Sequence, residues 1–501
     1  MNSFYKAVIV VIGVFMITLT ISCKQNKTEE VKKFNKQSKI DELISTYSEN
    51  GKFNGAVLVS EESEVIYKKG FGMANMEWDI PNQTGTKFRI ASITKQFTAT
   101  LVLQLVSENK LDLHVPISRY LPDYPKNNAD IITIHHLLTH TSGIPEFDDF
   151  VTYRDIERDR YRPEELMSIF AEGELQFTPG TEFAYTNPGY VVLGAIIEKV
   201  TGKSYALNLQ EKIFTPLKMN NSGYDYNYTV LKNRASGYSN KYLRNEYVNA
   251  NYVDMSIPYA AGSIYATVED LYLWDQALYS EKLLPANYRD LLFGKYISAY
   301  NGQHYGYGWI IGGMQIGTTS DRVETIGHSG GINGFRTLII RIPSSKSSII
   351  LLNNMEKTAL YEMAVAIIGI LHEQPYNPKK SSAYTLFDKI NSEGITKGLE
   401  HYKETKSSSD YYLDIDELNI AGYELMWADK LEEALIVFEL NVKAFPESFI
   451  VYDSYGEGLL VKGDTIQAIE NYKKSVELNP KNRGGINVLK ELGVNTDSLR
   501  Q

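Results

Sequence analysis

The sequence predicts an α/β (α+β) domain followed by an all-α C-terminal region. Apolar runs typical of strands occur near both ends of residues 38–373, and the stretch between them has a mostly helical pattern. Residues 385–501 instead repeat with themselves at an interval of 34 residues. A sheet built from both ends of the first domain would place its helical insert at a seam, where clefts tend to form.

Composition narrows the range of functions. The chain has 501 residues, 43% of them hydrophobic, so it can bury a large core and hold two or three domains. Its formal net charge is -10, and no basic tract occurs outside the extreme N-terminus, which argues against nucleic acid as the main partner. The single cysteine, Cys23, leaves no cysteine for a disulfide or a thiolate metal site in the mature fold.

The N-terminal segment, residues 1–22, predicts an export signal. A short basic start, Met1–Lys6, precedes the apolar run Ala7–Ile21, which is too short to indicate a membrane span. The residues up to Cys23 resemble the lipobox of bacterial lipoproteins, although Thr20 stands where Leu is usual. We therefore predict lipidation at Cys23 and a lipid-anchored place in the cell envelope. The alternative is an ordinary signal peptide with an incidental cysteine.

The next elements follow from composition and periodicity. Residues 23–37 are polar and Lys/Glu-rich, which predicts a flexible tether. A helix is expected near Ile40–Ser48, followed by a hairpin of Phe53–Val59 and Val65–Phe71. A Pro- and Lys-rich linker over 374–384 closes the domain. The other elements expected near its end are strands at Tyr305–Ile311, Phe335–Arg341 and Ser348–Asn353 and a helix at Thr358–Leu371.

The C-terminal region shows a repeat in register. Four positions recur 34 residues later, Gly422, Ala434, Phe438 and Pro446 as Gly456, Ala468, Tyr472 and Pro480. This interval, with small residues where two helices cross and a proline closing each unit, is the tetratricopeptide pattern. Two repeats bury little surface alone, so we expect a capping helix at 486–493 and a degenerate repeat within 385–402. Such repeats would bind a protein partner.

A serine and a lysine stand one helical turn apart at the start of an apolar helix. Ser92 and Lys95 form the order S-x-x-K, and the residues after them have helical apolar spacing. A serine hydroxyl needs a base to take its proton, and a lysine can do so when burial and the helix N-terminus lower its pKa. The pair therefore predicts a nucleophile and its base. The alternative is a serine N-cap beside a solvated lysine.

Two further segments carry polar groups suited to acyl transfer. Tyr185 precedes a helix that begins at Asn187-Pro188, so its phenol could act as a base near the lysine, and the Asn187 amide could anchor that lysine and a substrate carbonyl. Residues 325–335 place glycines around His328 at the end of a strand, where backbone N–H groups could form an oxyanion hole. Taken singly, these segments also fit a helix cap, a half-buried aromatic residue and a glycine-rich turn with a surface histidine.

One more histidine, His140, lies in a run that ends in Ser-Gly and Ile-Pro, which are signals for a helix end. We therefore favour a structural role for this histidine. His135 and His136 stand nearby, but no carboxylate or cysteine pattern accompanies them. The sequence thus predicts no metal site and no cofactor.

The set Ser92-x-x-Lys95, Tyr185-x-Asn187 and His328-Ser329-Gly330, in this order, resembles the serine β-lactamase and penicillin-binding-protein superfamily. More narrowly, it is similar to the class C β-lactamase-related serine hydrolases. The resemblance covers about residues 40–371 and implies a β-lactamase/transpeptidase-like domain, an antiparallel sheet flanked by helices plus a helical subdomain. The other segments that carry it are 138–143, 179–187 and 261–270.

The resemblance also implies roles for these residues. Ser92 would be the acylated nucleophile, Lys95 and Tyr185 would share the base role, and Asn187 would position the lysine and the substrate. The backbone amides of Ser92 and Gly331 would form the oxyanion hole. The remaining members of the third motif, His328, Ser329 and Gly330, would help to bind or position the substrate.

One departure from the superfamily pattern bears on the substrate. Class C β-lactamases carry Lys-Thr-Gly where this chain has His328-Ser329-Gly330, and a histidine is mostly neutral near pH 7. This argues against efficient β-lactam hydrolysis and favours a D-Ala-D-Ala-type peptidase or an esterase acting on a small or peptide-like substrate. The alternatives are a catalytically inactive sensor of peptidoglycan fragments and a scaffold that acts through its repeats.

Overall fold

The structure is a computed structural model that describes residues 35–241, 246–300, 302–356, 358–377, 380–408, 410–480 and 482–496. The predicted signal peptide, Cys23 and most of the predicted tether lie outside these residues. In the described part of the chain, no helix is both long and apolar enough to cross a membrane. The contacts divide the chain into two units, one running to Ser239 and then from Val248 to Tyr376, the other comprising Asn240–Tyr247 and the chain from Asn377 onward.

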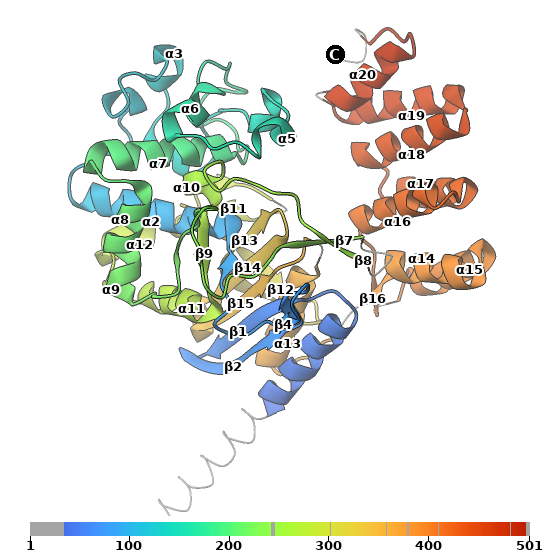
Figure 1. The fold of residues 1–501 in the computed structure, drawn as a ribbon, viewed down its shortest axis with the longest axis horizontal. Helices are drawn as coiled ribbons and strands as arrows, with labels where there is room; N and C mark the ends of the chain where they lie inside the picture. The colour runs from blue at the N-terminus through green and yellow to red at the C-terminus, as the bar shows by residue number, and fades with distance from the viewer. Residues whose placement is uncertain are drawn as a thin grey trace, which may run out of the picture. The chain divides into compact units, whose positions relative to one another are not determined.

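An eight-stranded antiparallel sheet forms the centre of the first unit (Figure 1). Its first strand pairs with its last in sequence, with Gly55 opposite Asn353. This pairing confirms the prediction that the sheet is assembled from both ends of the domain. In spatial order the strands are β10 (Ile297–Ser298), β11 (His304–Tyr305), β12 (Ile310–Gln315), β13 (Arg322–Ile332), β14 (Phe335–Ile342), β15 (Ser347–Asn353), β1 (Gly55–Glu61) and β2 (Glu64–Phe71).

Helices make up most of the remainder of this unit. The first covers residues 35–49, as the sequence predicts. The others are η1 (Ala91–Ile93), α2 (Thr94–Ser107), α3 (Lys126–Ala129), α4 (Ile134–Leu138), α5 (Tyr153–Ile156), α6 (Pro163–Ser168), α7 (Asn187–Thr201), α8 (Tyr205–Leu209), α9 (Thr215–Leu217), α10 (Tyr259–Gly262), α11 (Val268–Ala277), α12 (Ala286–Leu291) and α13 (Leu360–Leu371). A small sheet joins β5 (Phe88–Arg89), β9 (Ile264–Ala266) and β6 (Gly223–Tyr224), and a further pair is β3 (Met73–Asn75) with β4 (Ile80–Pro81). The pair of β7 (Tyr238–Lys241) and β8 (Glu246–Asn249) falls partly in each of the two units.

The central sheet buries both of its faces. Successive side chains of a strand point to opposite faces, and in β1 Ala56 and Leu58 join the apolar cluster that contains most of α2 and α7. Val57 and Val59 join a second cluster with the helix over residues 35–49 and with α13. This explains why β1 is apolar at almost every position, and it places the start of α2 against the inner face of the sheet.

The structure differs from the predicted strands at two places. The expected strand Tyr305–Ile311 is two short strands, because a turn at Gly308, with φ of +77°, separates β11 from β12. A Cβ at Gly308 would lie 2.8 Å from the carbonyl oxygen of Lys95, so the glycine allows the close approach of this turn to α2. The glycine-rich segment around His328, expected at a strand end or turn, lies within the 11-residue strand β13.

The second unit is mainly helical. In the described residues it contains α14 (Ser382–Glu393), α15 (Ile395–Thr405), α16 (Ile415–Trp427), α17 (Leu431–Ala444), α18 (Phe449–Lys462), α19 (Thr465–Leu478) and α20 (Arg483–Glu491), with a short parallel pair of β16 (Lys380–Ser381) and β17 (Tyr411–Tyr412). Gly422 packs against the ring of Phe438, and Gly456 against that of Tyr472, each pair joining two consecutive helices. These contacts are those expected of the repeat, although its assignment as tetratricopeptide stays a prediction.

Candidate active site

Ser92 lies in η1, directly before the buried helix α2. The preceding residue, Ala91, has a φ of +47°, a left-handed conformation that costs a non-glycine residue about 1 kcal/mol or more. The surrounding backbone holds this turn in place, since Ile90 N–H donates to the Ile264 carbonyl at 2.9 Å. Gly330 of β13 permits the turn to approach the sheet, because a Cβ there would lie 2.2 Å from the Ile90 oxygen. The serine is thus fixed against the sheet.

Lys95 lies one turn after Ser92 and has no exposed surface. Its Nζ is 3.1 Å from Ser92 Oγ, 2.8 Å from Asn187 Oδ1 and 3.1 Å from the Ala261 carbonyl oxygen. Burial lowers the pKa of Lys95 to about 7, although the Glu146 carboxylate acts in the opposite direction. A neutral amine keeps two N–H groups for the two carbonyl oxygens and directs its lone pair at the serine hydroxyl. The geometry and the pKa both suit a general base.

Tyr185 lies on the other side of the serine, with its ring centroid 4.8 Å from Lys95 Nζ. Burial raises the pKa of its phenol well above the usual value, and a hydrogen bond with Ser92 offsets this only in part. The phenol is therefore protonated near neutral pH. The raised pKa does not favour a phenolate, so the shared base role of Tyr185 stays a prediction, and a protonated phenol is suited to relaying a proton to and from Ser92.

Asn187 is oriented by a residue that the sequence analysis missed, Glu146. The N–H of Asn187 donates to Glu146 Oε2 at 2.8 Å, and its side-chain Nδ2 lies 3.2 Å from the same oxygen. Because Nδ2 faces the carboxylate, Oδ1 must face Lys95. A lone glutamate 41 residues before Asn187 has no spacing signal, so only the folded structure reveals it.

A cavity of about 210 Å³ opens beside Ser92. Gly331 of β13 lines it together with Ser92 and Asn187, so the two residues expected to form the oxyanion hole share one cavity. No charged side chain lines it. The remaining lining residues are Ala91, Phe147, Tyr153, Ile257, Pro258, Ala261, Gly262, Ile332 and Asn333.

The profile of the family described as Beta-lactamase matches residues 40–368, which is more than half of the chain. The chain belongs to the beta-lactamase family. This family consists of serine hydrolases, and penicillin-binding protein 4* of Bacillus subtilis strain 168 is 31% identical over 362 residues, or 69% of this chain and 78% of that protein. The putative penicillin-binding protein PbpX of the same organism is 31% identical over 342 residues, covering 67% of this chain and 80% of the relative.

Two solved structures of penicillin-binding proteins or their homologues are also similar to this chain. The penicillin-binding protein from Bacillus halodurans has 29% identity and a TM-score of 0.58, covering 65% of this chain and 97% of that one. The octameric penicillin-binding protein homologue from Pyrococcus abyssi has 30% identity and a TM-score of 0.58, covering 68% and 78%. The family match ends at residue 368, before the helical second unit. It therefore bears on the hydrolase domain alone.

In this β-lactamase-family hydrolase, His328 belongs to a buried chain of hydrogen bonds behind the site. Thr186 N–H donates to His140 Nδ1 at 3.2 Å, and His140 Nε2 is 3.2 Å from Tyr305 Oη. Tyr305 Oη is 3.0 Å from His328 Nε2, and His328 Nδ1 is 2.6 Å from the Ser329 carbonyl oxygen. A carbonyl only accepts, so Nδ1 of His328 carries its proton and Nε2 accepts from the Tyr305 hydroxyl. His140 Nδ1 accepts, so its Nε2–H donates to Tyr305.

These hydrogen bonds bear on the predicted role of His328 in binding or positioning the substrate. Burial lowers the pKa of His328 to about 4, with the nearby Lys95 acting in the same direction, and both ring nitrogens are engaged. The expected neutrality is confirmed, but the side chain is only 4% exposed and does not offer a free nitrogen to a substrate. In β13, Ser329 and Gly331 occupy exposed positions while His328 and Gly330 are buried. The ring of His140 packs on that of Tyr185, with centroids 4.2 Å apart.

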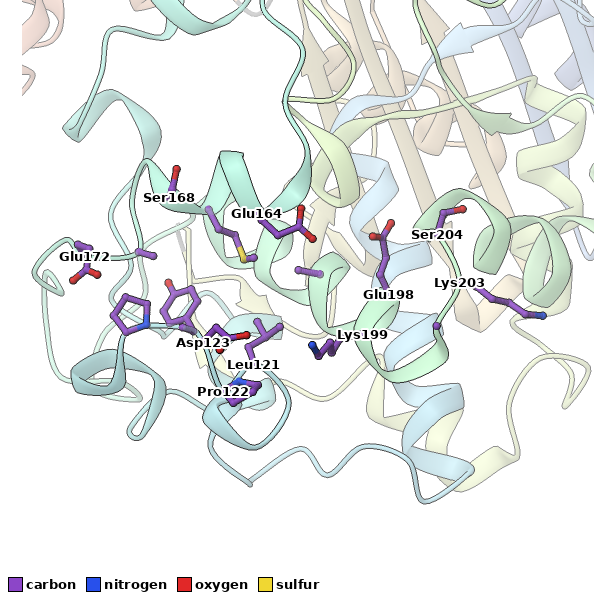
Figure 2. A pocket seen from close by; sticks show the side chains of 16 residues that line it. Leu121, Pro122, Asp123, Glu164, Ser168, Glu172, Glu198, Lys199, Lys203 and Ser204 are labelled. Carbon is purple, nitrogen blue, oxygen red and sulfur yellow. The ribbon is translucent and has the colours of Figure 1, made fainter.

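A larger cavity of the hydrolase unit lies elsewhere, lined by residues that include some of α6 and α7 (Figure 2). Its volume is about 740 Å³, and it contains none of the residues predicted to act in catalysis. Its charged side chains have both signs, and some are engaged elsewhere: Glu198 accepts from Tyr205 N–H and Lys203 pairs with Glu211. In the described part of the chain, no group of three or more His, Cys, Asp or Glu is placed to hold a metal ion.

Proposed function

We propose that this serine hydrolase cleaves an amide or ester through an acyl-enzyme on Ser92. The observation that carries the proposal is the contact between Ser92 Oγ and a fully buried Lys95 amine whose pKa is about 7. A lysine with this pKa is about half deprotonated at neutral pH, as a general base requires. A lysine with a purely structural role would have no function that depends on losing its proton.

The reaction would begin with transfer of the Ser92 proton to the Lys95 amine while Ser92 Oγ attacks the substrate carbonyl carbon. The carbonyl oxygen becomes an oxyanion, which the backbone N–H groups of Ser92 and Gly331 would stabilise. Asn187 would hold the resulting ammonium through its Oδ1, and the Ala261 carbonyl provides a second acceptor. The positive charge of the base is therefore matched by acceptors already in place.

The tetrahedral intermediate would then expel its leaving group. The Lys95 ammonium returns its proton, through the Ser92–Tyr185 hydrogen-bond network, to the leaving nitrogen or oxygen, and the carbonyl re-forms as a Ser92 ester. Water attacks this ester with the neutral Lys95 again taking a proton, and Ser92 is released. The two groups that move protons in these steps, Lys95 and Tyr185, are both within hydrogen-bond reach of Ser92.

For the substrate, we favour a D-Ala-D-Ala-type peptide or an ester over a β-lactam, with weak β-lactamase activity as a lesser possibility. The described residues that line the cavity beside Ser92 are all uncharged, and the histidine in place of the motif lysine is neutral and buried. Two relatives are described as penicillin-binding proteins, one of them as a putative one, which supports reaction with penicillin. The proposed setting is the cell envelope, with a lipid anchor at Cys23 and a protein partner on the C-terminal helices.

The test is intact mass spectrometry of the protein from Lys24 onward after exposure to benzylpenicillin and, separately, to a fluorophosphonate. We expect one adduct per chain with at least one reagent, and its loss in Ser92→Ala. Ser168→Ala, which removes an exposed serine of α6, serves as the matched control and should label like wild type.

The outcomes separate the candidate activities. A penicillin adduct on Ser92 would favour cell-wall peptide chemistry, and a fluorophosphonate adduct alone would favour an esterase. If neither reagent labels correctly folded protein, the enzymatic proposal fails. A sensor that binds peptidoglycan fragments without turnover, or a scaffold acting through residues 385–501, would then take its place.

A further inference from the structure

A second cavity, of about 420 Å³, adjoins the one beside Ser92, because Asn333 lines both. Its charged lining side chains are two arginines, Arg89 and Arg234. Amide and hydroxyl groups of Ser236, Asn249 and Asn333 contribute to the rest, and among the residues that the structure describes no carboxylate lines it. The cavity is therefore polar and positively charged, in contrast to the uncharged cavity around the nucleophile.

The two arginines share one carboxylate. Arg89 Nε donates to Asp225 Oδ2 at 2.7 Å and Arg234 Nη1 donates to Asp225 Oδ1 at 2.8 Å. Asp225 is 1% exposed, whereas Arg89 and Arg234 are 14% and 27% exposed. Two guanidiniums against one carboxylate leave one positive charge uncompensated, with several N–H donors beyond the two engaged.

Three other carboxylates bond to residues that line the cavity, but none of these bonds is to either arginine. Glu157 accepts from the Asn333 side chain at 3.2 Å, Asp254 from the hydroxyl of Tyr252 at 3.3 Å, and Glu77 bonds to Asn249. None of the three carboxylates is among the lining residues. The small sheet fixes the arginines, since Arg89 ends β5 and Asp225 follows β6 directly.

We propose that this arginine pair is an anion subsite of the hydrolase, and that it binds a carboxylate carried by the substrate beyond the reacting carbonyl. This inference rests on the proposed function. The inference also accounts for His328-Ser329-Gly330 in place of Lys-Thr-Gly. Because His328 is neutral and buried, a cation that binds an anionic substrate must come from another element. The arginines supply that cation in a cavity that shares Asn333 with the cavity of the nucleophile, and a guanidinium suits the planar geometry of a carboxylate.

The test compares two matched pairs of substrates by kcat/KM. One pair is p-nitrophenyl hydrogen glutarate and its methyl ester, which place the charge on the acyl side. The other is phenylacetyl thioglycolate and its methyl ester, which place it on the leaving group. We expect wild type to prefer the anionic member of one pair by about tenfold or more, since hydrogen bonds between charged groups contribute that much.

Arg234→Gln should abolish this preference by lowering kcat/KM for the anionic member about tenfold or more, and an unchanged circular dichroism spectrum checks that the fold is intact. Arg234→Lys should retain part of it. Arg160→Gln, which removes an arginine that lies over the ring of Tyr228, controls for net charge and should leave the preference unchanged. Equal rates for charged and neutral members of both pairs in wild type, or a preference that persists in Arg234→Gln, would overturn the proposal.

A binding measurement separates failure of the subsite from failure of the proposed hydrolase. Calorimetry with the Ser92→Ala protein should detect glutarate, and Arg234→Gln in that background should weaken its binding about tenfold or more. Inorganic phosphate is the second probe, and if it binds as tightly as glutarate the cavity takes free anions and the substrate assignment is wrong. If no ester is hydrolysed but glutarate binds through Arg234, the hydrolase fails and the anion subsite stands; absence of glutarate binding refutes the subsite.

Discussion

The substitution Glu146→Gln should shift the pH dependence of acylation to lower pH. In wild type, Ser92 reacts only with Lys95 deprotonated, so the rate should rise through a midpoint near pH 7 and then level off. The Glu146 carboxylate favours the charged form of Lys95 and so raises its pKa. Removing that charge lowers the pKa, and a larger fraction of Lys95 is then neutral at pH 6.

The size of the shift follows from the geometry. Asn187 connects the two charges through hydrogen bonds of 2.8 Å to Lys95 and 3.2 Å to Glu146. They therefore lie roughly 8 Å apart, and at an effective dielectric constant of about 20 their attraction is of the order of 2 kcal/mol. Since one pKa unit corresponds to about 1.4 kcal/mol, the midpoint should fall by about one pH unit. Glutamine keeps an oxygen that accepts from Asn187, so the amide orientation is retained.

The assay is the second-order rate of fluorophosphonate labelling between pH 5 and 9, measured for wild type, Glu146→Gln and Glu164→Gln. The last variant removes an exposed carboxylate on α6 and should keep the wild-type midpoint. A midpoint that stays in place or moves upward in Glu146→Gln would refute the reasoning. A rate that does not change with pH in wild type would show that Lys95 is not the base.

Three further variants test the surrounding groups. Lys95→Arg replaces the base by a guanidinium that stays charged, so labelling of the serine should slow by about 10²- to 10⁴-fold at pH 8 in rapid-quench experiments. Tyr305→Phe removes the hydroxyl that donates to His328 Nε2, so urea unfolding should show a loss of about 1–3 kcal/mol, and nitrogen NMR should show a shifted Nε2 resonance while Nδ1, which donates to the Ser329 carbonyl, keeps its proton. Gly330→Ala places a Cβ 2.2 Å from the Ile90 oxygen, so thermal unfolding should reveal about 1–3 kcal/mol of strain, and labelling should be impaired as well.

The elements with clear periodicity could be predicted from the sequence, and the glycine-rich ones could not. The hairpin of β1 and β2 and the strands β14 and β15 lie within a few residues of their expected positions. In β13, by contrast, Gly327, Gly330 and Gly331 were expected only at the end of a strand, with a turn as the alternative, and the 11-residue strand was not among the expected runs, because glycine is unfavourable within a strand. A contact between distant parts of the chain explains one of these glycines. Gly330 leaves room for the turn at Ile90, and no local sequence pattern reveals that contact.

The candidate site could also be predicted only in part from the sequence. Short motifs were enough to bring Ser92, Lys95 and Asn187 together, since each begins a helix or lies one turn from its start. Charge states were harder to infer, because burial decides them: Tyr185 was expected to ionise, but its buried phenol has a raised pKa. Glu146 had no signal at all, because its role depends on a contact across 41 residues.

Burial also explains why one ionisation should dominate the pH dependence near neutrality. His140 and His328 have lowered pKa values, and Tyr185 and Tyr305 have raised ones, so all four are neutral between pH 6 and 8. Lys95 has a pKa near 7, mainly because burial lowers it. Burial also raises the pKa of the Glu146 carboxylate, which acts on Lys95 from the far side of Asn187. A second ionisation that disappears in Glu146→Gln would therefore belong to that carboxylate. One that persists between pH 6 and 8 in Glu146→Gln would mean that one of the two buried histidines is charged and that their hydrogen-bond chain is not as assigned.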